Sequence, residues 1–253
     1  MRTAPFMLAI ALGLAACSTP EETPVSTSRV VPATYQARID QGPQGQPIQI
    51  PAVRAAYLTD RNTRQRVAYN GPESAGTIVV DPYARFLYHV LGNGEAMRFG
   101  IAVGKAGKGY HGNATINRKA AWPSWTPTAN MVRTEPELYG DKAGGVKGGV
   151  DNPLGSRALY LYEGGRDTMY RIHGTMDPSS IGKATSAGCI RLFNQDIIDL
   201  FNEIPNGTRV KVRSQSESLQ YEGPLVDTPD GYLMSSSEMQ AMQLAESQAA
   251  AKK

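Results

Sequence analysis

The sequence runs Tyr170-Arg171-Ile172-His173-Gly174-Thr175 and, a short way on, Ser186-Ala187-Gly188-Cys189-Ile190-Arg191-Leu192. In the first run, a strand-like pattern ends at His173 and a glycine follows, which is typical of a β-strand that stops where the chain turns. The second run has a cysteine directly after a glycine, and glycine allows the tight turn that would expose main-chain N–H groups there. The sequence therefore predicts an imidazole at a sheet edge and a thiol directly after a tight turn.

A cysteine nucleophile needs a base to take its proton, a group that orients the base, and main-chain donors for the oxyanion. His173 can be that base, and beside it a thiol with a pKa of about 8.5 would be partly ionised at neutral pH. The alternative is an inert, buried Cys189 and a core histidine, which is the commoner fate of a free cysteine. Small residues before Cys189 and the charged Arg191 after it favour a loop at a cleft.

Other site classes find little support in the composition. Two cysteines and three histidines, His89, His111 and His173, show neither the paired spacing of a metal centre nor a Cys-x-x-Cys motif. The Gly-x-Ser-x-Gly motif of serine hydrolases is absent. A net charge of +3 without basic clusters gives no support for nucleic-acid binding. We therefore expect no metal, no cofactor and no nucleic-acid partner.

The N-terminus has the pattern of a secretion signal. Arg2 precedes an apolar stretch from Phe6 to Ala16 that is too short to span a membrane as a helix, so residues 1–16 are predicted to be removed. The ending Leu14-Ala15-Ala16-Cys17 resembles a lipobox, in which the cysteine becomes the lipidated first residue. The alternative is an ordinary signal peptide with an incidental Cys17. If Cys17 is lipidated, Cys189 has no disulfide partner.

Composition divides the rest of the chain into three parts. Residues 17–70 are rich in Pro, Thr, Ser and Gln and are predicted to form a tether or arm. Residues 71–213 carry the strand patterns of a β-rich domain. Residues 214–253 are acidic, then Ala-rich, and are predicted to be a tail. The expected strands are 77–80, 85–91, 97–103, 114–117, 158–162, 168–173 and 208–212.

One hairpin and one helix are clearly indicated within the domain. Gly92-Asn93-Gly94-Glu95 joins two strand patterns, and Asn-Gly is a strong hairpin signal. Asn194–Ile204 has an apolar face, with Asn194 as its expected cap and Pro205 as its stop. Between the strands, residues 122–155 carry many Gly and Pro and predict long surface loops.

The two opening runs resemble the signature of the L,D-transpeptidase (YkuD) catalytic domain, His-Gly-Thr followed by Ser-x-Gly-Cys-Ile-Arg, with sixteen residues from His173 to Cys189. Three upstream segments also look like the Gram-negative, periplasmic lipoprotein branch: 113–116, 122–127 and 151–155. The resemblance covers about residues 76–213. It implies a mainly β, sandwich- or barrel-like fold with a few short helices.

The resemblance also implies a mechanism. Cys189 would attack the diaminopimelate carbonyl of a peptidoglycan stem, release the terminal D-Ala and form a thioester, and His173 would be the base. The Gly174 carbonyl would orient the ring, and the N–H groups of Gly188 and Cys189 would bind the oxyanion. Substrate binding would fall to three residues: Arg191, for which a structural ion pair is the alternative, Ser186 and Thr175. Many relatives have a histidine where this chain has Ala187.

Several alternatives stay open at this stage. The acyl acceptor could be a second stem peptide, a lysine of an outer-membrane lipoprotein, or water. A catalytically silent peptidoglycan-binding lipoprotein and a scaffold acting through the tails are the hypotheses of another class. The expected location is the periplasm, with a lipid anchor in the inner or outer membrane. Papain-like enzymes are disfavoured because their cysteine precedes their histidine.

Overall fold

The computed structural model describes residues 30–104, 110–186 and 188–250, without the side chains of Thr185, Ser186 and Ala249. The predicted signal peptide and Cys17 lie outside this part. Within it, no helix is long and apolar enough to cross a membrane.

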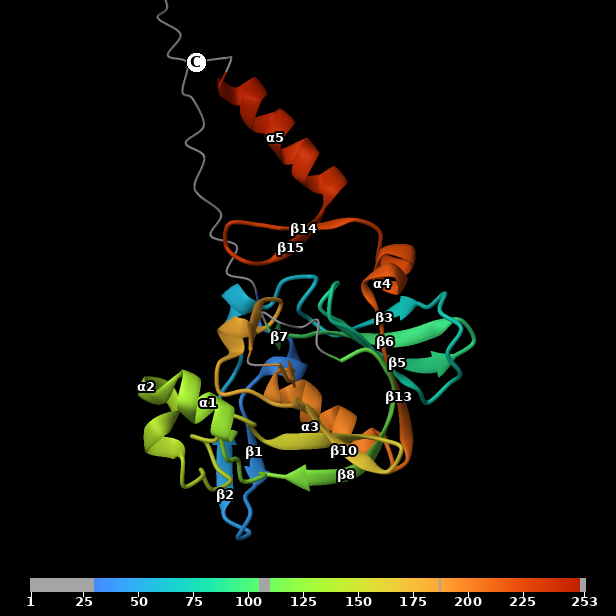
Figure 1. Ribbon diagram of the computed structural model, residues 1–253. Helices are drawn as coiled ribbons and strands as arrows, with labels where there is room; N and C mark the ends of the chain where they lie inside the picture. Colours follow the sequence, from blue (N-terminus) through green and yellow to red (C-terminus); the bar gives the residue numbers. More distant parts are fainter. Residues whose placement is uncertain (1–29, 105–109, 187, 251–253) are drawn as a thin grey trace, which may run out of the picture.

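A curved sheet of nine strands carries the fold (Figure 1). Its order is β12-β10-β9-β8-β13-β4-β5-β6-β3, and most neighbours are antiparallel. Two pairs are parallel, β13 with β4 and β10 with β12. The strands are β3 (Gln65–Ala68), β4 (Ile78–Asp81), β5 (Phe86–Gly92), β6 (Glu95–Gly100), β8 (Gly112–Ala121), β9 (Arg157–Glu163), β10 (Arg166–His173), β12 (Ile190–Arg191) and β13 (Thr208–Val212).

The expected hairpin and helix are confirmed. Asn93 and Gly94 both have positive φ, 52° and 74°, as the two-residue turn between β5 and β6 requires. Helix α3 (Asn194–Glu203) packs its apolar face, including Ile197 and Leu200, into the main core. The mainly β fold is therefore as predicted. Cys189 lies directly before β12, and α3 begins shortly after that strand.

Two sequence predictions need correction here. The expected strand 97–103 is broken: β6 ends at Gly100, and the chain leaves the sheet so that Ala102 can pair with Arg191 before the short β7 (Val103–Gly104). Asn194 does not cap α3, because Phe193 occupies the N-cap position and no side chain bonds there. The amide of Asn194 instead bonds Ser156 and Thr175.

The segment expected to be a loose arm is folded from Ala33 onward. It forms β1 (Arg38–Gln41), β2 (Pro47–Ile50), two 3-10 turns (Ala33–Tyr35 and Ala55–Tyr57) and then β3 of the main sheet. Tyr35 and Ile50 are buried, and the Tyr35 hydroxyl donates to Asp196 of α3. Asp40 binds both guanidinium nitrogens of Arg157, at 2.6 and 2.9 Å. A few apolar side chains and long-range ion pairs thus attach this segment to α3 and β9.

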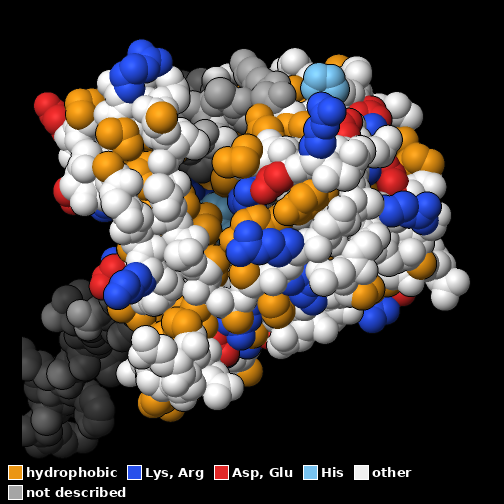
Figure 2. Space-filling model, turned by 60° about the horizontal axis from the view of Figure 1, so that its bottom comes forward, with side chains coloured by type: hydrophobic (Ala, Val, Ile, Leu, Met, Phe, Trp, Pro, Cys, Tyr) orange, Lys and Arg blue, Asp and Glu red, His pale blue; other side chains and the backbone are white. Residues whose placement is uncertain are grey.

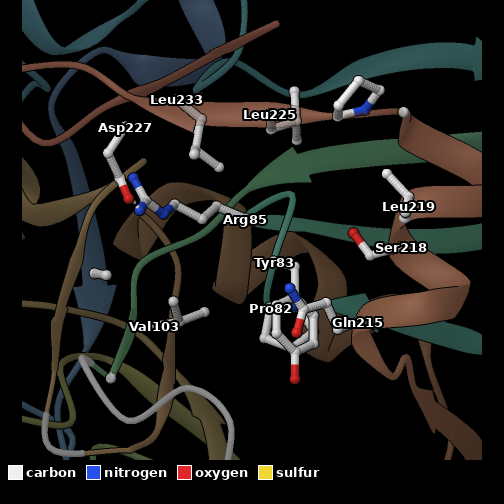
Figure 3. A pocket seen from close by; sticks show the side chains of 14 residues that line it. Pro82, Tyr83, Arg85, Val103, Gln215, Ser218, Leu219, Leu225, Asp227 and Leu233 are labelled. Atoms are coloured by element: carbon white, nitrogen blue, oxygen red, sulfur yellow. Dashed lines mark hydrogen bonds and ion pairs between the residues drawn. The ribbon is translucent and has the colours of Figure 1, made fainter. Parts of the chain in front are cut away.

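The expected C-terminal tail is also folded as far as Ser235, through α4 (Gln215–Glu222), β14 (Leu225–Asp227) and β15 (Leu233–Ser235). Arg213, 1% exposed, binds Asp81 at 3.2 Å and Glu222 at 2.9 Å. Figure 3 shows Arg85 and Asp227 pointing toward one another beside a cavity of about 490 Å³. Beyond it, α5 (Ser236–Ala250) is largely exposed and projects away from the domain (Figure 1).

The loops between β8 and β9 are long, as expected, but contain short helices: α1 (Ala129–Thr134), α2 (Pro136–Tyr139) and a 3-10 turn (Gly140–Lys142). They form a lobe beside the sheet (Figure 1). Another 3-10 turn (Pro178–Ser180) and β11 (Ala184–Ser186), which pairs with β7, lie between the two motifs. This lobe and the β10–β12 edge border the candidate site.

Removing residues 214–253 takes Glu222 away from the buried Arg213 and uncovers the pocket side of β7. We expect the melting temperature to fall by roughly 5–10 °C, because a buried charge loses a partner. Removing only residues 236–253 deletes the exposed α5 and should shift the melting temperature by less than about 2 °C. Circular dichroism melts of both truncations test this, and equal shifts would contradict the structural role assigned to α4 and β14.

Candidate active site

The parallel pairing of β10 with β12 joins the two motifs. Ile172 lies opposite Ile190 and His173 opposite Arg191, and Leu192 N–H donates to the His173 carbonyl at 2.8 Å. Cys189 directly precedes β12, so in this register it lies level with Arg171, two residues before His173, near the C-terminal end of β10. The sequence prediction that these two residues meet is consistent with this register.

Both residues line one cavity of about 540 Å³. Figure 2 looks onto a face that is hollowed beside a lobe, with hydrophobic side chains around the hollow and Lys and Arg side chains near its border. Aromatic and thioether side chains from both sides form much of the wall. The lining residues are Ser124, Trp125, Thr126, Thr128, Asn130, Met131, Tyr139, Pro153, Leu154, Tyr160, Met169, Tyr170, Arg171, His173, Gly188, Cys189 and Arg191.

The ring of His173 is buried and held by the main chain. Its Nδ1 lies 2.6 Å from the carbonyl oxygen of Gly174. A carbonyl oxygen only accepts hydrogen bonds, so Nδ1 carries the proton and Nε2 keeps its lone pair. Burial, and then the positive charge of Arg191, lower the pKa of His173 from 6.5 to about 3. The imidazole is therefore neutral at pH 7 and has one basic nitrogen.

The thiol of Cys189 is also neutral at rest. Burial raises its pKa, and the hydrogen bond from the Arg171 main chain and the charges of Arg171 and Arg191 only partly oppose this. This corrects the expectation of a partly ionised thiol at neutral pH. The physical reason is that neither charge is favoured in the buried pocket, so the thiol proton would move to His173 only during a reaction.

Gly188 and Arg191 border the thiol. Gly188 has φ of +136°, a conformation that side-chain-bearing residues rarely adopt. Of the two guanidinium groups in the cavity, Arg171 binds Asp167 through two nitrogens, at 2.6 and 2.8 Å. Among the described residues Arg191 has no ion-pair partner, and its buried Nε makes no hydrogen bond. The alternative of a structural ion pair for Arg191 therefore finds no partner in this part of the chain.

The other expected site residues are placed differently. The Thr175 hydroxyl is buried, accepts from Asp177 N–H at 3.0 Å, and does not line the cavity. The side chain of Ser186 and the whole of Ala187 and Cys17 lie outside the described residues. His111 is exposed, and His89 faces Glu203, with 3.4 Å between Nδ1 and the carboxylate. Among the described residues, no group of His, Cys, Asp and Glu could hold a metal ion.

Comparison with known proteins identifies this architecture. The family model of the L,D-transpeptidase catalytic domain, YkuD, matches residues 75–212, which is more than half of the chain. The chain belongs to the YkuD family. The match begins after β3 and ends with β13, so this catalytic domain contains His173, Cys189 and all but one strand of the large sheet.

Two curated YkuD relatives come from Escherichia coli K12. The probable L,D-transpeptidase YbiS is 40% identical over 139 residues, 54% of this chain and 44% of that protein. The probable L,D-transpeptidase ErfK/SrfK is 38% identical over 142 residues, 55% of this chain and 44% of that protein. The chain thus spans less than half the length of these relatives.

Two solved structures show likenesses with low TM-scores. A Brucella melitensis protein, named a probable carnitine operon oxidoreductase, is 46% identical with a TM-score of 0.43, covering 60% of this chain and 94% of that one. An Enterococcus faecium L,D-transpeptidase mutant is 17% identical with a TM-score of 0.41, covering 55% and 50%. TM-scores this low do not bear on the function of this YkuD domain.

Sequence reasoning missed two features of the site. Met169 lines the cavity with a positive φ of 64° and is 64% exposed, because β10 has an irregular register between Asp167 and Arg171. Tyr160 lies between the guanidinium groups of Arg118 and Arg171, at 4.3 and 4.4 Å from its ring centre. No residue pattern predicts the bulge in β10. The alternation of inward and outward side chains along β9 could have placed Tyr160 on the face of the cavity. Of the two tryptophans, only Trp125 lines the cavity, and Trp122 is buried.

The lowered pKa of His173 predicts how stability depends on pH. Between about pH 6.5 and about pH 3 the unfolded chain protonates this imidazole and the folded chain does not. The free energy of unfolding therefore falls as the pH drops through this window. His173→Gln removes this loss, so the variant should gain on the order of a few kcal/mol relative to wild type as the pH falls toward about 4. Urea unfolding curves measure the difference, and a difference that does not change with pH would refute the buried, neutral imidazole.

Proposed function

We propose that this chain is a peptidoglycan L,D-transpeptidase with Cys189 as its nucleophile and His173 as its base. The observation that carries the proposal is the Nδ1–H bond from His173 to the Gly174 carbonyl, in the same cavity that Cys189 lines. This bond leaves Nε2 as the only basic ring nitrogen, as a proton acceptor for a thiol must have. Membership of the YkuD family supplies the reaction class.

The first half of the reaction acylates the enzyme. The sulfur of Cys189 attacks the diaminopimelate carbonyl at stem position three while its proton passes to Nε2 of His173. Main-chain N–H groups at Gly188 and Cys189 are the proposed donors to the oxyanion. When the intermediate collapses, the C–N bond to the terminal D-Ala breaks and its amine takes the proton from Nε2. The product is a thioester on Cys189 and free D-Ala.

The second half transfers the acyl group. An amine of another stem peptide, or of a lipoprotein lysine, gives a proton to Nε2 and attacks the thioester carbonyl. The C–S bond then breaks, and the sulfur recovers the proton from His173. Water in place of the amine would give hydrolysis. The neutral resting state of both groups suits this cycle, because Nε2 is free to accept a proton at each half-reaction.

Arg191 is the residue proposed to bind a substrate carboxylate. It lines the cavity, and it lacks an ion-pair partner among the described residues, whereas Arg171 is already bound to Asp167. A planar guanidinium can bind a carboxylate with two parallel hydrogen bonds. Diaminopimelate and D-Ala both carry carboxylates, so the stem peptide supplies the charge that Arg191 would bind.

The chain would act in the periplasm, held by a lipid on Cys17 to the inner or outer membrane. The signal-like residues 1–16 and the lipobox pattern support this.

Metabolic labelling with a fatty-acid analogue should mark the wild type and not Cys17→Ala. Label that persists in the variant would remove the anchor from the proposal.

The proposed activity predicts defined products from disaccharide-tetrapeptides. Mass spectrometry should show loss of D-Ala together with crosslinked dimers, and Cys189→Ala should lower the rate at least about 1000-fold. Loss of D-Ala without dimers would assign hydrolysis instead. No product from the wild type would overturn the enzyme proposal in favour of a silent peptidoglycan-binding protein.

The role of Arg191 predicts a change mainly in substrate binding. Arg191→Ala should raise KM about 10- to 100-fold, because one charge-assisted contact is worth about 1.5–3 kcal/mol. Arg191→Lys should recover part of this loss. Arg209→Ala, at an exposed position on β13, is the matched control and should leave KM unchanged. Steady-state kinetics of D-Ala release decide, and an unchanged KM in Arg191→Ala would remove Arg191 from substrate binding.

A further inference from the structure

Asn194 lies at the first position of α3, but its side chain is directed away from the helix end. No side chain caps α3, and the N-cap position belongs to Phe193. The amide of Asn194 instead reaches two other segments, one preceding β9 and one following β10. It is therefore the point at which the chain after Cys189 contacts the chain after His173.

The hydrogen bonds of Asn194 fix its amide in one orientation. Its Oδ1 accepts from Ser156 N–H at 2.9 Å and from the Ser156 hydroxyl at 3.0 Å. Its Nδ2 donates to the carbonyl oxygen of Thr175 at 2.8 Å. Because an N–H only donates and a carbonyl only accepts, the amide cannot be turned over without losing these bonds. Ser156 is fully buried, so no water replaces them easily.

Two glycines make room for this amide. A Cβ on Gly174 would lie 2.2 Å from Asn194 Oδ1, and a Cβ on Gly155 would lie 2.5 Å from the same oxygen. The Cβ on Gly155 would also come within 2.6 Å of the nitrogen of Thr175. The segment that follows His173 is therefore packed directly against both Gly155 and Asn194, with no side chain between them.

The peptide that follows His173 is held on both sides as a result. Gly174 N–H donates to the Arg157 carbonyl at 3.0 Å, and the Thr175 carbonyl accepts from Asn194. Between these two anchors lies the Gly174 carbonyl, which accepts Nδ1–H of His173 at 2.6 Å. Any rotation of this peptide would turn the carbonyl away from the ring.

The first turn of α3 is itself fixed from its other side by the N-terminal segment. The Gln195 amide donates to the Pro51 carbonyl at 2.9 Å, and Tyr35 donates to Asp196 at 3.2 Å. These contacts come from residues outside the matched catalytic domain. Asn194 therefore projects from a helix end that is held on two sides, which a positioning role requires.

We propose that Asn194 is a positioning residue, which holds the Gly174–Thr175 backbone so that the Gly174 carbonyl keeps His173 in its Nδ1-protonated form with Nε2 available to Cys189. This inference rests on the proposed function, because it concerns the base of that reaction. Without the amide, the peptide can rotate and the ring can adopt the other tautomer, whose protonated Nε2 cannot accept the thiol proton.

Two substitutions test the proposal. Asn194→Ala removes all three hydrogen bonds, and Asn194→Asp keeps an acceptor for Ser156 while losing the donor to Thr175. Both should lower kcat for D-Ala release about 10- to 100-fold, a part of the contribution of general-base catalysis, with KM changed less than about twofold. Asn202→Ala, at an exposed position on the same helix α3, is the matched control and should leave kcat within about twofold.

The tautomer of His173 gives a readout that does not depend on activity. With three histidines in the chain, the His173 signals in ¹⁵N-detected ring spectra are identified by their loss in His173→Gln. The wild type should show Nδ1–H alone, and both Asn194 variants should show an Nε2–H population. An unchanged tautomer and kcat in a folded variant would overturn the proposal.

Two further results distinguish a role of Asn194 in folding from a role in positioning His173. Thermal melts show whether the variants are folded, and loss of the fold in both would also overturn the proposal, because Asn194 would then serve stability alone. If the wild type releases no D-Ala, the transpeptidase proposal fails, while the tautomer comparison still decides for or against Asn194.

Discussion

The two-residue pairing of β12 with β10 is the contact on which the candidate site depends. It sets Ile190 beside Ile172 and Arg191 beside His173, so that Cys189, the residue before β12, lies near the C-terminal end of β10. A pairing this short supplies few hydrogen bonds, each worth about 1 kcal/mol. Its register is supported by burial of Ile190, Leu192 and Phe193, and by Ala102, which bonds Arg191 on the opposite side of β12.

Burial shifts the pKa values of His173 and Cys189 in opposite directions, and both shifts favour the neutral form. It lowers the pKa of the imidazole and raises that of the thiol, so the pair rests without charge. In the proposed reaction, the guanidinium groups of Arg171 and Arg191 would matter most when negative charge develops on sulfur or on the oxyanion. The same positive charges favour an anionic sulfur or oxyanion and disfavour a protonated His173.

Local patterns sufficed for several elements within the YkuD match, although not for the break after Gly100 or the cap of α3. The Asn93-Gly94 turn, the strands around it and the apolar face of α3 follow from short-range rules, and the neighbouring motifs indicated Cys189 and His173. Local patterns could not predict the packing of residues 30–70, because this packing depends on pairs of residues far apart in the chain, such as Asp40 with Arg157. The same holds for Arg213 with Asp81, and for the bulge that directs Met169 into the cavity.

The partner that orients His173 is a main-chain carbonyl, not a carboxylate side chain. Every residue type carries that oxygen, so no substitution at position 174 can delete it, and change can reach it only through the surroundings that set its direction. The partner also brings no charge of its own, so it aligns the ring without adding an anion near Cys189, whose sulfur would become negative in the proposed reaction. Mutational sensitivity in this site should therefore be spread over neighbours such as Gly155 and Ser156, and a scan limited to side chains touching the imidazole would overlook it.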